Sequence, residues 1–154
     1  MITIKKITAR EILDSRRDPT IETEVVLSDG SKGSSGIPSG VSTGAYEAHE
    51  LRDKDPSRYN GKGVLKAIEN VNKTIASTLI GSNPLNQIEV DKKLIELDKT
   101  ENKENLGANA ILSVSIAILK AVANSQKTPL FSYINKVFGF EEIKRMPVPP
   151  FNLI

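Results

Sequence analysis

The sequence predicts one α+β domain, a three-stranded antiparallel meander followed by about four helices. Apolar residues alternate in the manner of strands only within residues 1–37, and helical spacing appears only after residue 61. Strands that precede the helices, rather than alternating with them, argue against a fold built from βαβ units. The length of 154 residues is also that of a single domain.

The three strands are expected within residues 2–37. Apolar residues scattered through residues 2–13 indicate the first strand. In the second, residues 21–27, alternate residues share one face, namely Ile21, Thr23, Val25 and Leu27. Asp29 and Gly30 follow, and this pair predicts a hairpin because both residues tolerate positive φ. A third short strand in residues 31–37 completes the meander.

The first two helices are predicted to be amphipathic. The first has apolar residues at spacings of three and four and ends at Gly81, because glycine favours the position after a helix. Its stripe consists of Val64, Ile68, Val71, Ile75 and Leu79. The second helix covers about residues 86–98 and directs Val90, Leu94 and Leu97 inward.

The third helix begins near Gly107 and is apolar nearly all round, so we expect it to be the buried one. One side carries Ile111, Val114, Ile118, Ala121 and Val122, and the other carries Leu112, Ile116 and Leu119. A last helix starts near Pro129, which suits a first turn, and ends near Val137. Prolines within residues 146–150 then favour an extended segment. We therefore expect the domain to cover residues 1–145 and a linker into a further domain to begin in residues 146–154.

Composition excludes several classes of function. The net charge is only +2 and aromatic residues make up 5%, so we expect no nucleic-acid partner. With no cysteine and one histidine, His49, the chain by itself cannot form a disulfide, a thiolate metal site or a multi-histidine cluster. No apolar run approaches the ~20 residues of a membrane helix, and no signal peptide is recognisable. We therefore expect no membrane partner and a cytoplasmic location.

The most informative segment is a glycine-rich loop, residues 36–44. It contains Gly36, Gly40 and Gly44 as flexible points, together with a proline and three hydroxyl side chains. Loops of this kind cover substrates, contact anions through backbone N–H groups or offer oxygen ligands to hard cations. From composition alone, a solvated connection is the simpler interpretation. The loop is no Walker sequence, because the lysine required after the last glycine is absent.

Two further polar segments have mainly structural interpretations. Residues 47–53 form a run of charges, and such a run is usually a solvated face. His49 lies between two glutamates and is interpreted as a surface residue rather than a ligand or base. Residues 14–16, Asp-Ser-Arg, indicate a turn with local hydrogen bonds or a contact to a partner.

Taken together, these and other motifs resemble the enolase family, in order and spacing, over essentially the whole chain. The motifs are residues 12–16 (ILDSR), 19–20 (PT), 38–44 (PSGVSTG), 47–48 (EA), 50–53 (ELRD), 61–65 (GKGVL), 69–72 (ENVN), 100–103 (TENK), 106–112 (LGANAIL) and 147–149 (PVP), with Asn152. Enolases reversibly dehydrate 2-phosphoglycerate to phosphoenolpyruvate in glycolysis, using two Mg²⁺ ions per active site. The resemblance implies a homo-oligomer, dimer or octamer, when the protein is full length. Some enolases also appear at the cell surface.

The resemblance also implies what the chain lacks. In the family, a meander-plus-helix domain precedes an α/β barrel, and the barrel holds the lysine base, the assisting glutamate and the carboxylates of the tighter Mg²⁺. No catalytic residue can therefore be assigned within this chain, and we expect the chain alone to be inactive. The family's substrate-closing loop corresponds to Ser39, Gly40, Val41, Ser42, Thr43 and Gly44. Ser42 matches the serine that binds the second Mg²⁺, with Gly40 and Gly44 as hinges. Arg10, Arg16 and Glu22 match residues of the dimer interface.

Three positions depart from the family pattern. Arg17-Asp18 stands where Gly-Asn is usual, and if that glycine has positive φ, Arg17 strains the turn by about 1 kcal/mol. Val41 replaces a small alanine within the loop, and Ser113 replaces a common glycine in the third helix. The resemblance favours the first domain of a complete enolase. Alternatives are a non-catalytic stand-alone binding or assembly module and a separately encoded half that joins a barrel half.

Overall fold

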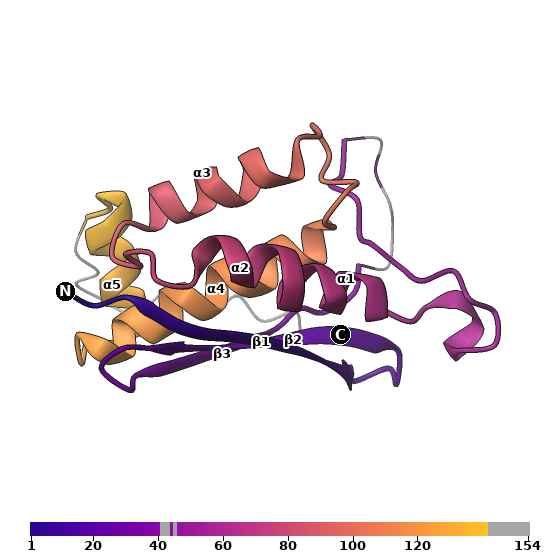
Figure 1. The fold of residues 1–154 in the computed structure, drawn as a ribbon, viewed down its shortest axis with the longest axis horizontal. Coiled ribbons are helices and arrows are strands. Elements are labelled where there is room, and N and C mark those ends of the chain that lie inside the picture. Colours follow the sequence, from indigo (N-terminus) through magenta and orange to yellow (C-terminus); the bar gives the residue numbers. More distant parts are fainter. Residues whose placement is uncertain (41–43, 45, 142–154) are drawn as a thin grey trace, which may run out of the picture.

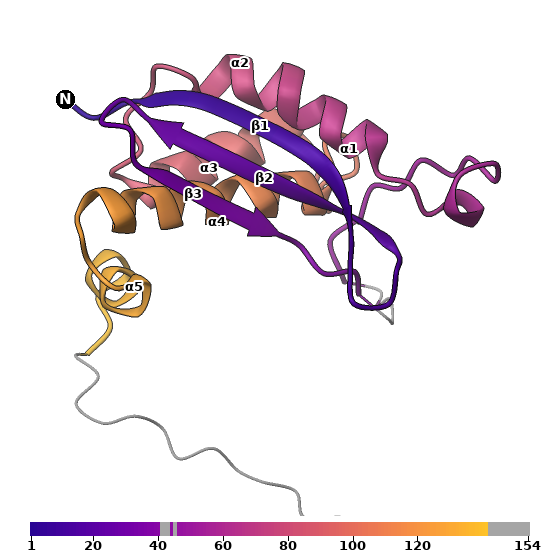
Figure 2. The ribbon, with the colours of Figure 1, turned by 90° about the horizontal axis from the view of Figure 1, so that it is seen from below.

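A computed structural model describes residues 1–40, 44 and 46–141 of the chain. It confirms an α+β fold in which a three-stranded antiparallel sheet is followed by helices on one of its faces (Figure 1). The strands are β1 (Ile4–Leu13), β2 (Pro19–Leu27) and β3 (Lys32–Gly36), in the order β1-β2-β3. The view from below places the three strands in front of the helices, with α5 at the side (Figure 2).

The central strand confirms the alternation predicted for it. Every second side chain of β2 faces the helices and is fully buried, namely Ile21, Thr23, Val25 and Leu27. The hairpin to β3 is closed by the Gly30 N–H, which donates to the Leu27 carbonyl at 3.0 Å. Gly30 takes a φ of 88°, whereas Asp29 does not adopt positive φ, so only the glycine carries the conformation that the turn requires.

The turn between β1 and β2 places Arg17 in the left-handed region that was the condition for strain there, with a φ of 65°. Asp14 holds this turn closed, because its carboxylate accepts hydrogen bonds from the N–H groups of Arg16 at 2.8 Å and Asp18 at 2.9 Å. Its carbonyl also accepts from the Arg17 N–H at 3.0 Å. The local hydrogen bonding expected at residues 14–16 is therefore present, and it offsets a left-handed conformation that disfavours a side chain.

Residues 65–79 form one helical rod with a widened middle. It consists of α1 (Leu65–Glu69), the π-helical turn η2 (Asn70–Ile75) and α2 (Ala76–Leu79), with helical dihedral angles at both junctions. Its buried side consists of four residues of the predicted apolar stripe and two alanines, namely Val64, Val71, Ile75 and Leu79 with Ala67 and Ala76. Ile68 is only half-buried, because the small Ala67 occupies the position closest to the core. The rod ends as predicted, with Gly81 at a φ of 86°.

The widened turn η2 carries Asn72, whose amide completes the outer edge of β1. Its carbonyl oxygen accepts from the Ala9 N–H at 2.7 Å, and its NH₂ donates to the Ala9 carbonyl at 3.1 Å. Farther along the same edge, the Ile4 N–H donates to Ser82 at 3.0 Å and its carbonyl accepts from Gly81 at 2.8 Å. Backbone groups at a sheet edge otherwise invite another strand, so these contacts help to protect β1 from pairing with other chains.

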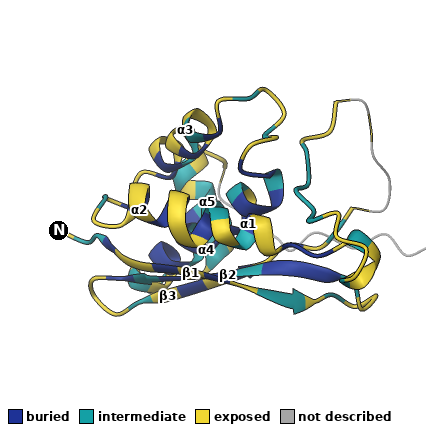
Figure 3. Ribbon diagram, turned by 45° about the vertical axis from the view of Figure 1, so that its right-hand side comes forward, coloured by how far each residue is buried: buried dark blue, intermediate teal, exposed yellow. Residues whose placement is uncertain are grey.

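The remaining helices follow the predicted limits closely. After the short 3-10 turn η1 (Tyr59–Gly61) and the rod come α3 (Gln87–Asp98), α4 (Ala108–Ser125) and α5 (Leu130–Phe138). The Asn86 side chain accepts from the Glu89 N–H and caps α3. α4 packs on β2 and β3, η2 packs on β1, and α3 packs on α4 (Figure 1). Buried residues gather between sheet and helices (Figure 3).

The burial predicted for α4 is right for one side except at Ile111, and it is wrong in degree for the other side. Val114, Ile118, Ala121 and Val122 are buried, whereas Ile111, Ile116 and Leu119 are half-buried and Leu112 is exposed. The buried side of α4 also takes up several small residues, namely Ala110, Ser113, Ala117, Ala121 and Ala123, which leaves part of the larger side chains outside the core. α4 is long and apolar enough to cross a membrane by length and composition alone, but here half of it is buried inside the fold, as expected of a core helix.

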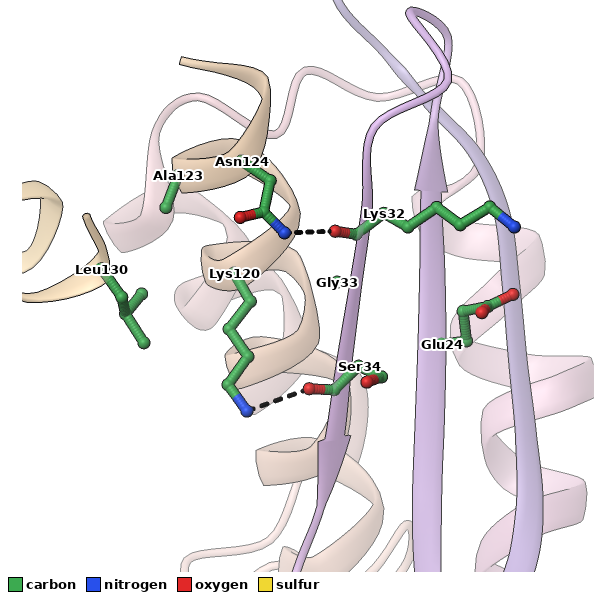
Figure 4. Close-up of a pocket in the computed structure, with 8 residues that line it drawn as sticks. All are labelled: Glu24, Lys32, Gly33, Ser34, Lys120, Ala123, Asn124 and Leu130. Carbon is green, nitrogen blue, oxygen red and sulfur yellow. Dashed lines mark hydrogen bonds between the residues drawn. The ribbon is translucent and has the colours of Figure 1, made fainter. Parts of the chain in front are cut away.

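Small residues allow β3 and α4 to approach closely at Gly33. A Cβ on Gly33 would overlap the Ala117 carbonyl oxygen and the Ala121 backbone nitrogen. Two side chains of α4 then hold the outer edge of β3 (Figure 4): Asn124 donates to the Lys32 carbonyl at 2.7 Å and Lys120 to the Ser34 carbonyl at 3.0 Å. These residues line an open depression of about 360 Å³, in which the Lys120 amine and the Asn124 amide bond the backbone of β3.

We predict that Gly33→Ala lowers the free energy of unfolding by about 1–3 kcal/mol, because the methyl group forces two backbone segments apart. Gly36→Ala, in the same strand, is the matched control. Its Cβ would meet only the Ile12 side chain at 3.4 Å, so we expect a change below about 1 kcal/mol. Urea denaturation of both variants provides the comparison. Equal stabilities would contradict a close strand–helix contact at Gly33.

Candidate functional site

The described part of the glycine-rich loop and the segment after it line a cleft of about 500 Å³. The cleft lies beside the N-terminal end of α4, which contributes Ala108, Asn109 and Leu112. The loop and its return segment contribute Ile37, Pro38, Gly40, Gly44, Glu47, Ala48, His49, Glu50 and Arg52, and Asn102 completes the lining. The segment that sequence motifs singled out therefore borders a concave surface lined by both polar and apolar residues.

The structure places only part of the predicted substrate-closing loop. Val41, Ser42 and Thr43 lie outside the described residues, while Ser39, Gly40 and Gly44 lie within them. The Gly44 N–H donates to the Glu47 carboxylate at 2.9 Å, and the Glu47 N–H donates back to the Gly44 carbonyl at 3.1 Å. Gly44 has neither positive φ nor a crowded Cα, so this conformation alone does not require glycine there. Its hinge role stays a prediction.

The base of the loop is joined by Arg52, Glu50 and Ser39, which we call the Arg52 cluster. Arg52 donates to Glu50 at 2.7 Å and also to the Ser39 hydroxyl oxygen. The Ser39 hydroxyl in turn donates to the same Glu50 oxygen at 3.1 Å. The Arg52 side chain is only 17% exposed, and that of Glu50 is 31% exposed. The cluster is therefore an ordered, partly desolvated ion pair rather than a pair of mobile surface charges.

Asp53, the next residue of the charged run 47–53, caps the N-terminal end of the helical rod although it lies well before the rod in the sequence. Its two carboxylate oxygens accept from the N–H groups of Leu65 and Lys66, each at 2.9 Å. Glu11 of β1 accepts from the Val64 N–H at 3.0 Å and binds Arg58 at 2.6 Å. This hydrogen bond and the Glu11 charge raise the pKa of Arg58. The interpretation of residues 47–53 as a solvated face is thus wrong for its second half, because folding gives these charges specific partners.

A buried asparagine anchors the segment that returns from the loop. Asn109 of α4 is 3% exposed; its oxygen accepts from the Leu51 N–H and its NH₂ donates to the Leu51 carbonyl, both at 3.1 Å. His49 is held through its backbone, which donates to the Asn102 carbonyl at 2.7 Å and accepts from the Ala108 N–H at 2.8 Å. Gly107, at a φ of 92°, lets this segment approach, because a Cβ there would lie 2.5 Å from that of Leu51.

The three predicted interface residues lie on or beside the face of the sheet opposite the helices. Arg10 and Glu22 are cross-strand neighbours in β1 and β2 and form an ion pair within the chain. The Arg10 side chain is 75% exposed and that of Glu22 is 23% exposed. Arg16 lies in the exposed turn after β1. Both arginines are thus exposed in the single chain, whereas Glu22 is half-buried and paired internally.

Residues 1–40, 44 and 46–141 contain no group of three His, Asp or Glu side chains that could hold a metal ion. The one ligand predicted for Mg²⁺, Ser42, is outside those ranges. The described residues therefore do not by themselves fit a tight Mg²⁺ site, and groups beyond them would have to supply most of the ligands.

Sequence reasoning did not assign a role to Arg52 or Asn109, although both lie within recognised motifs. Asn109 had a recognisable signal, because an asparagine on the inner face of an apolar helix needs a buried partner. Arg52 had none that composition could supply, because three of its four partners lie in other segments of the chain, at Pro19, Ser39 and Lys62.

These features define an α+β domain in which helices cover one face of a three-stranded meander and a glycine-rich loop rises from an ordered polar base beside a cleft. The sequence matches the family described as enolase, N-terminal domain, over residues 4–134. The chain belongs to this family.

We predict that Asn109→Ala lowers the free energy of unfolding by about 1–3 kcal/mol, because it leaves both polar groups of the Leu51 peptide without their partner. Asn102→Ala is the control: Asn102 bonds His49 through its backbone carbonyl, and its side chain bonds only the exposed Glu104. Urea denaturation should leave this second variant within about 0.5 kcal/mol of the original chain. A similar loss in both variants would show that the Asn109 side chain is not the anchor.

Proposed function

We propose that this chain acts as the first domain of an enolase, which reversibly dehydrates 2-phosphoglycerate to phosphoenolpyruvate. In this role the domain supplies a loop that closes over substrate bound to a C-terminal α/β barrel. Residues 146–154 begin the linker to that barrel, and the enzyme works in the cytoplasm. The observation that carries the proposal is the family match over residues 4–134, with the loop motif inside it.

The geometry around the loop supports this proposal. A loop that closes repeatedly needs a base that stays in place, and both of its ends are tied to the folded domain. Ser39 is bonded within the Arg52 cluster, and Leu51 is bonded to Asn109 of α4. Between these ties lies the glycine-containing segment with Ser42. Closure of such a segment excludes water from a reacting substrate.

The chemistry assigned to this chain is limited to its own residues. Mg²⁺ supplies charge stabilisation for the enolate-like intermediate when it is bound. Ser42 is proposed to offer its hydroxyl and carbonyl oxygens to the second of two Mg²⁺ ions. The described residues offer no clustered acids for the first ion. The proton-abstracting base and the group that assists departure of the hydroxyl are proposed to lie in the barrel.

The three interface residues are proposed to contact a second subunit in a homo-oligomer. In the single chain, Arg10 and Glu22 satisfy each other across β1 and β2. Pairing of either residue with a partner subunit would therefore exchange one ion pair for another, and the net gain would be smaller than that of a new pair. Arg16 carries its charge at the exposed end of the same hairpin.

We predict that the 154-residue chain alone does not convert 2-phosphoglycerate, because the base, the assisting acid and the ligands of the tighter Mg²⁺ are proposed to lie in the barrel. Purified chain, shown to be free of host enolase, should give no phosphoenolpyruvate absorbance above the blank at any Mg²⁺ concentration. Fusion to an enolase barrel domain should restore turnover. Turnover by the chain alone would refute the placement of the chemistry, and an inactive fusion with a folded barrel would favour a stand-alone binding module.

We predict that Ser42→Ala in the fused enzyme lowers kcat and raises the Mg²⁺ concentration needed for activity, because one oxygen ligand of the second ion is lost. Loss of a single such interaction typically costs about tenfold or more in rate. Thr43→Ala removes a neighbouring hydroxyl from the same loop and is the matched control, expected to keep the original Mg²⁺ dependence. An unchanged Mg²⁺ titration in Ser42→Ala would rule out the serine as a ligand.

A further inference from the structure

Among the described residues that line the cleft, Arg52 has the most side-chain hydrogen-bond partners, and three of the four lie in other parts of the chain. One terminal nitrogen donates to the backbone carbonyls of Pro19, at the start of β2, and Lys62, before the helical rod. The other donates to the Ser39 hydroxyl and to Glu50. The guanidinium therefore joins the sheet, the start of the rod and both ends of the glycine-rich loop.

These contacts occupy the N–H groups of both terminal nitrogens of Arg52. The two terminal nitrogens of a guanidinium carry four N–H groups, and the chain's own oxygens accept four hydrogen bonds from them. Glu50 also balances its positive charge at 2.7 Å. Although Arg52 lines the cleft, its terminal nitrogens already hold oxygens of the chain, and bidentate binding of an anion by both of them would require it to release bonds already made.

The Ser39 hydroxyl is oriented by the same cluster. Because its oxygen accepts from Arg52, its hydrogen is directed to the Glu50 oxygen at 3.1 Å. Arg52, Glu50 and Ser39 thus form a closed triangle of hydrogen bonds. Ser39 lies in the first part of the glycine-rich loop, so this triangle ties that end of the loop to the domain.

We propose that Arg52 is a positioning residue, which fixes the base of the glycine-rich loop by holding Ser39 and Glu50 against the carbonyls of Pro19 and Lys62. The inference rests on the proposed function for its catalytic consequence, but its structural part concerns only described residues. Arginine is required because its planar fork reaches four oxygens in set directions. A lysine keeps the charge but has three donors on one atom, so it cannot hold all four.

The first test measures hydrogen exchange of the 154-residue chain by mass spectrometry. In Arg52→Lys and Arg52→Gln, we expect amides of residues 36–40 and 46–52 to exchange at least about tenfold faster, as loss of a charge-assisted hydrogen bond implies. Exchange of the β2 amides should become faster only as far as the loss of global stability accounts for. Arg58→Lys is the matched control, a partly buried arginine that binds Glu11 and Asp53 outside the cleft lining. It should leave exchange in residues 36–40 unchanged.

The second test measures kinetics in the fusion with an enolase barrel domain. Arg52→Lys should lower kcat by about tenfold while KM for 2-phosphoglycerate changes less than about threefold, because loop placement acts in the transition state more than in substrate binding. Arg58→Lys should keep kcat per folded molecule. If the unaltered fusion is inactive, the proposed enolase function fails while the exchange test still decides the loop base. Unchanged exchange in both Arg52 variants, or full kcat in Arg52→Lys, would overturn the proposal.

Discussion

The absence of a side chain at Gly33 lets β3 lie directly on α4, against the backbone of Ala117 and Ala121. This contact sets the height of α4 above the sheet, and with it the position of the helix's first turn. Asn109 in that turn can then reach both polar groups of the Leu51 peptide. The packing contact at Gly33 thus determines where the segment after the glycine-rich loop is held, although this segment is distant from Gly33 in the sequence.

Polar groups hold the loop base because apolar packing cannot do so at the border of a cleft. Side chains there face water on one side, so burial supplies little directional force. Hydrogen bonds to backbone carbonyls and between charged groups are directional, and partial burial of Arg52 and Asp53 strengthens them. The same arrangement is sensitive to substitution, because removal of one partner leaves other polar groups without a hydrogen bond. These hydrogen bonds therefore fix the geometry of the loop base more than they add to the stability of the fold.

Predictions that rest on local pattern agree best with the structure. The buried face of β2, the hairpin at Gly30, the end of the rod at Gly81 and the limits of α3 to α5 all follow from periodicity and turn chemistry. Predictions that depend on neighbours far along the chain did less well. The exposed Leu112 and the ordered charges of residues 50–53 differ from expectation, because their surroundings are made by other elements.

The sequence by itself determined the fold class, the order of the elements and the family, because side-chain periods of 2 and 3.6 and the preferences of glycine are local properties. It also identified the loop that the proposed function depends on. Only the tertiary structure decided that Arg52 joins residues 19, 39, 50 and 62, and that Arg10 pairs with Glu22 inside the chain. Such contacts form between segments that no local pattern connects, so they exist only once the sheet and helices have packed.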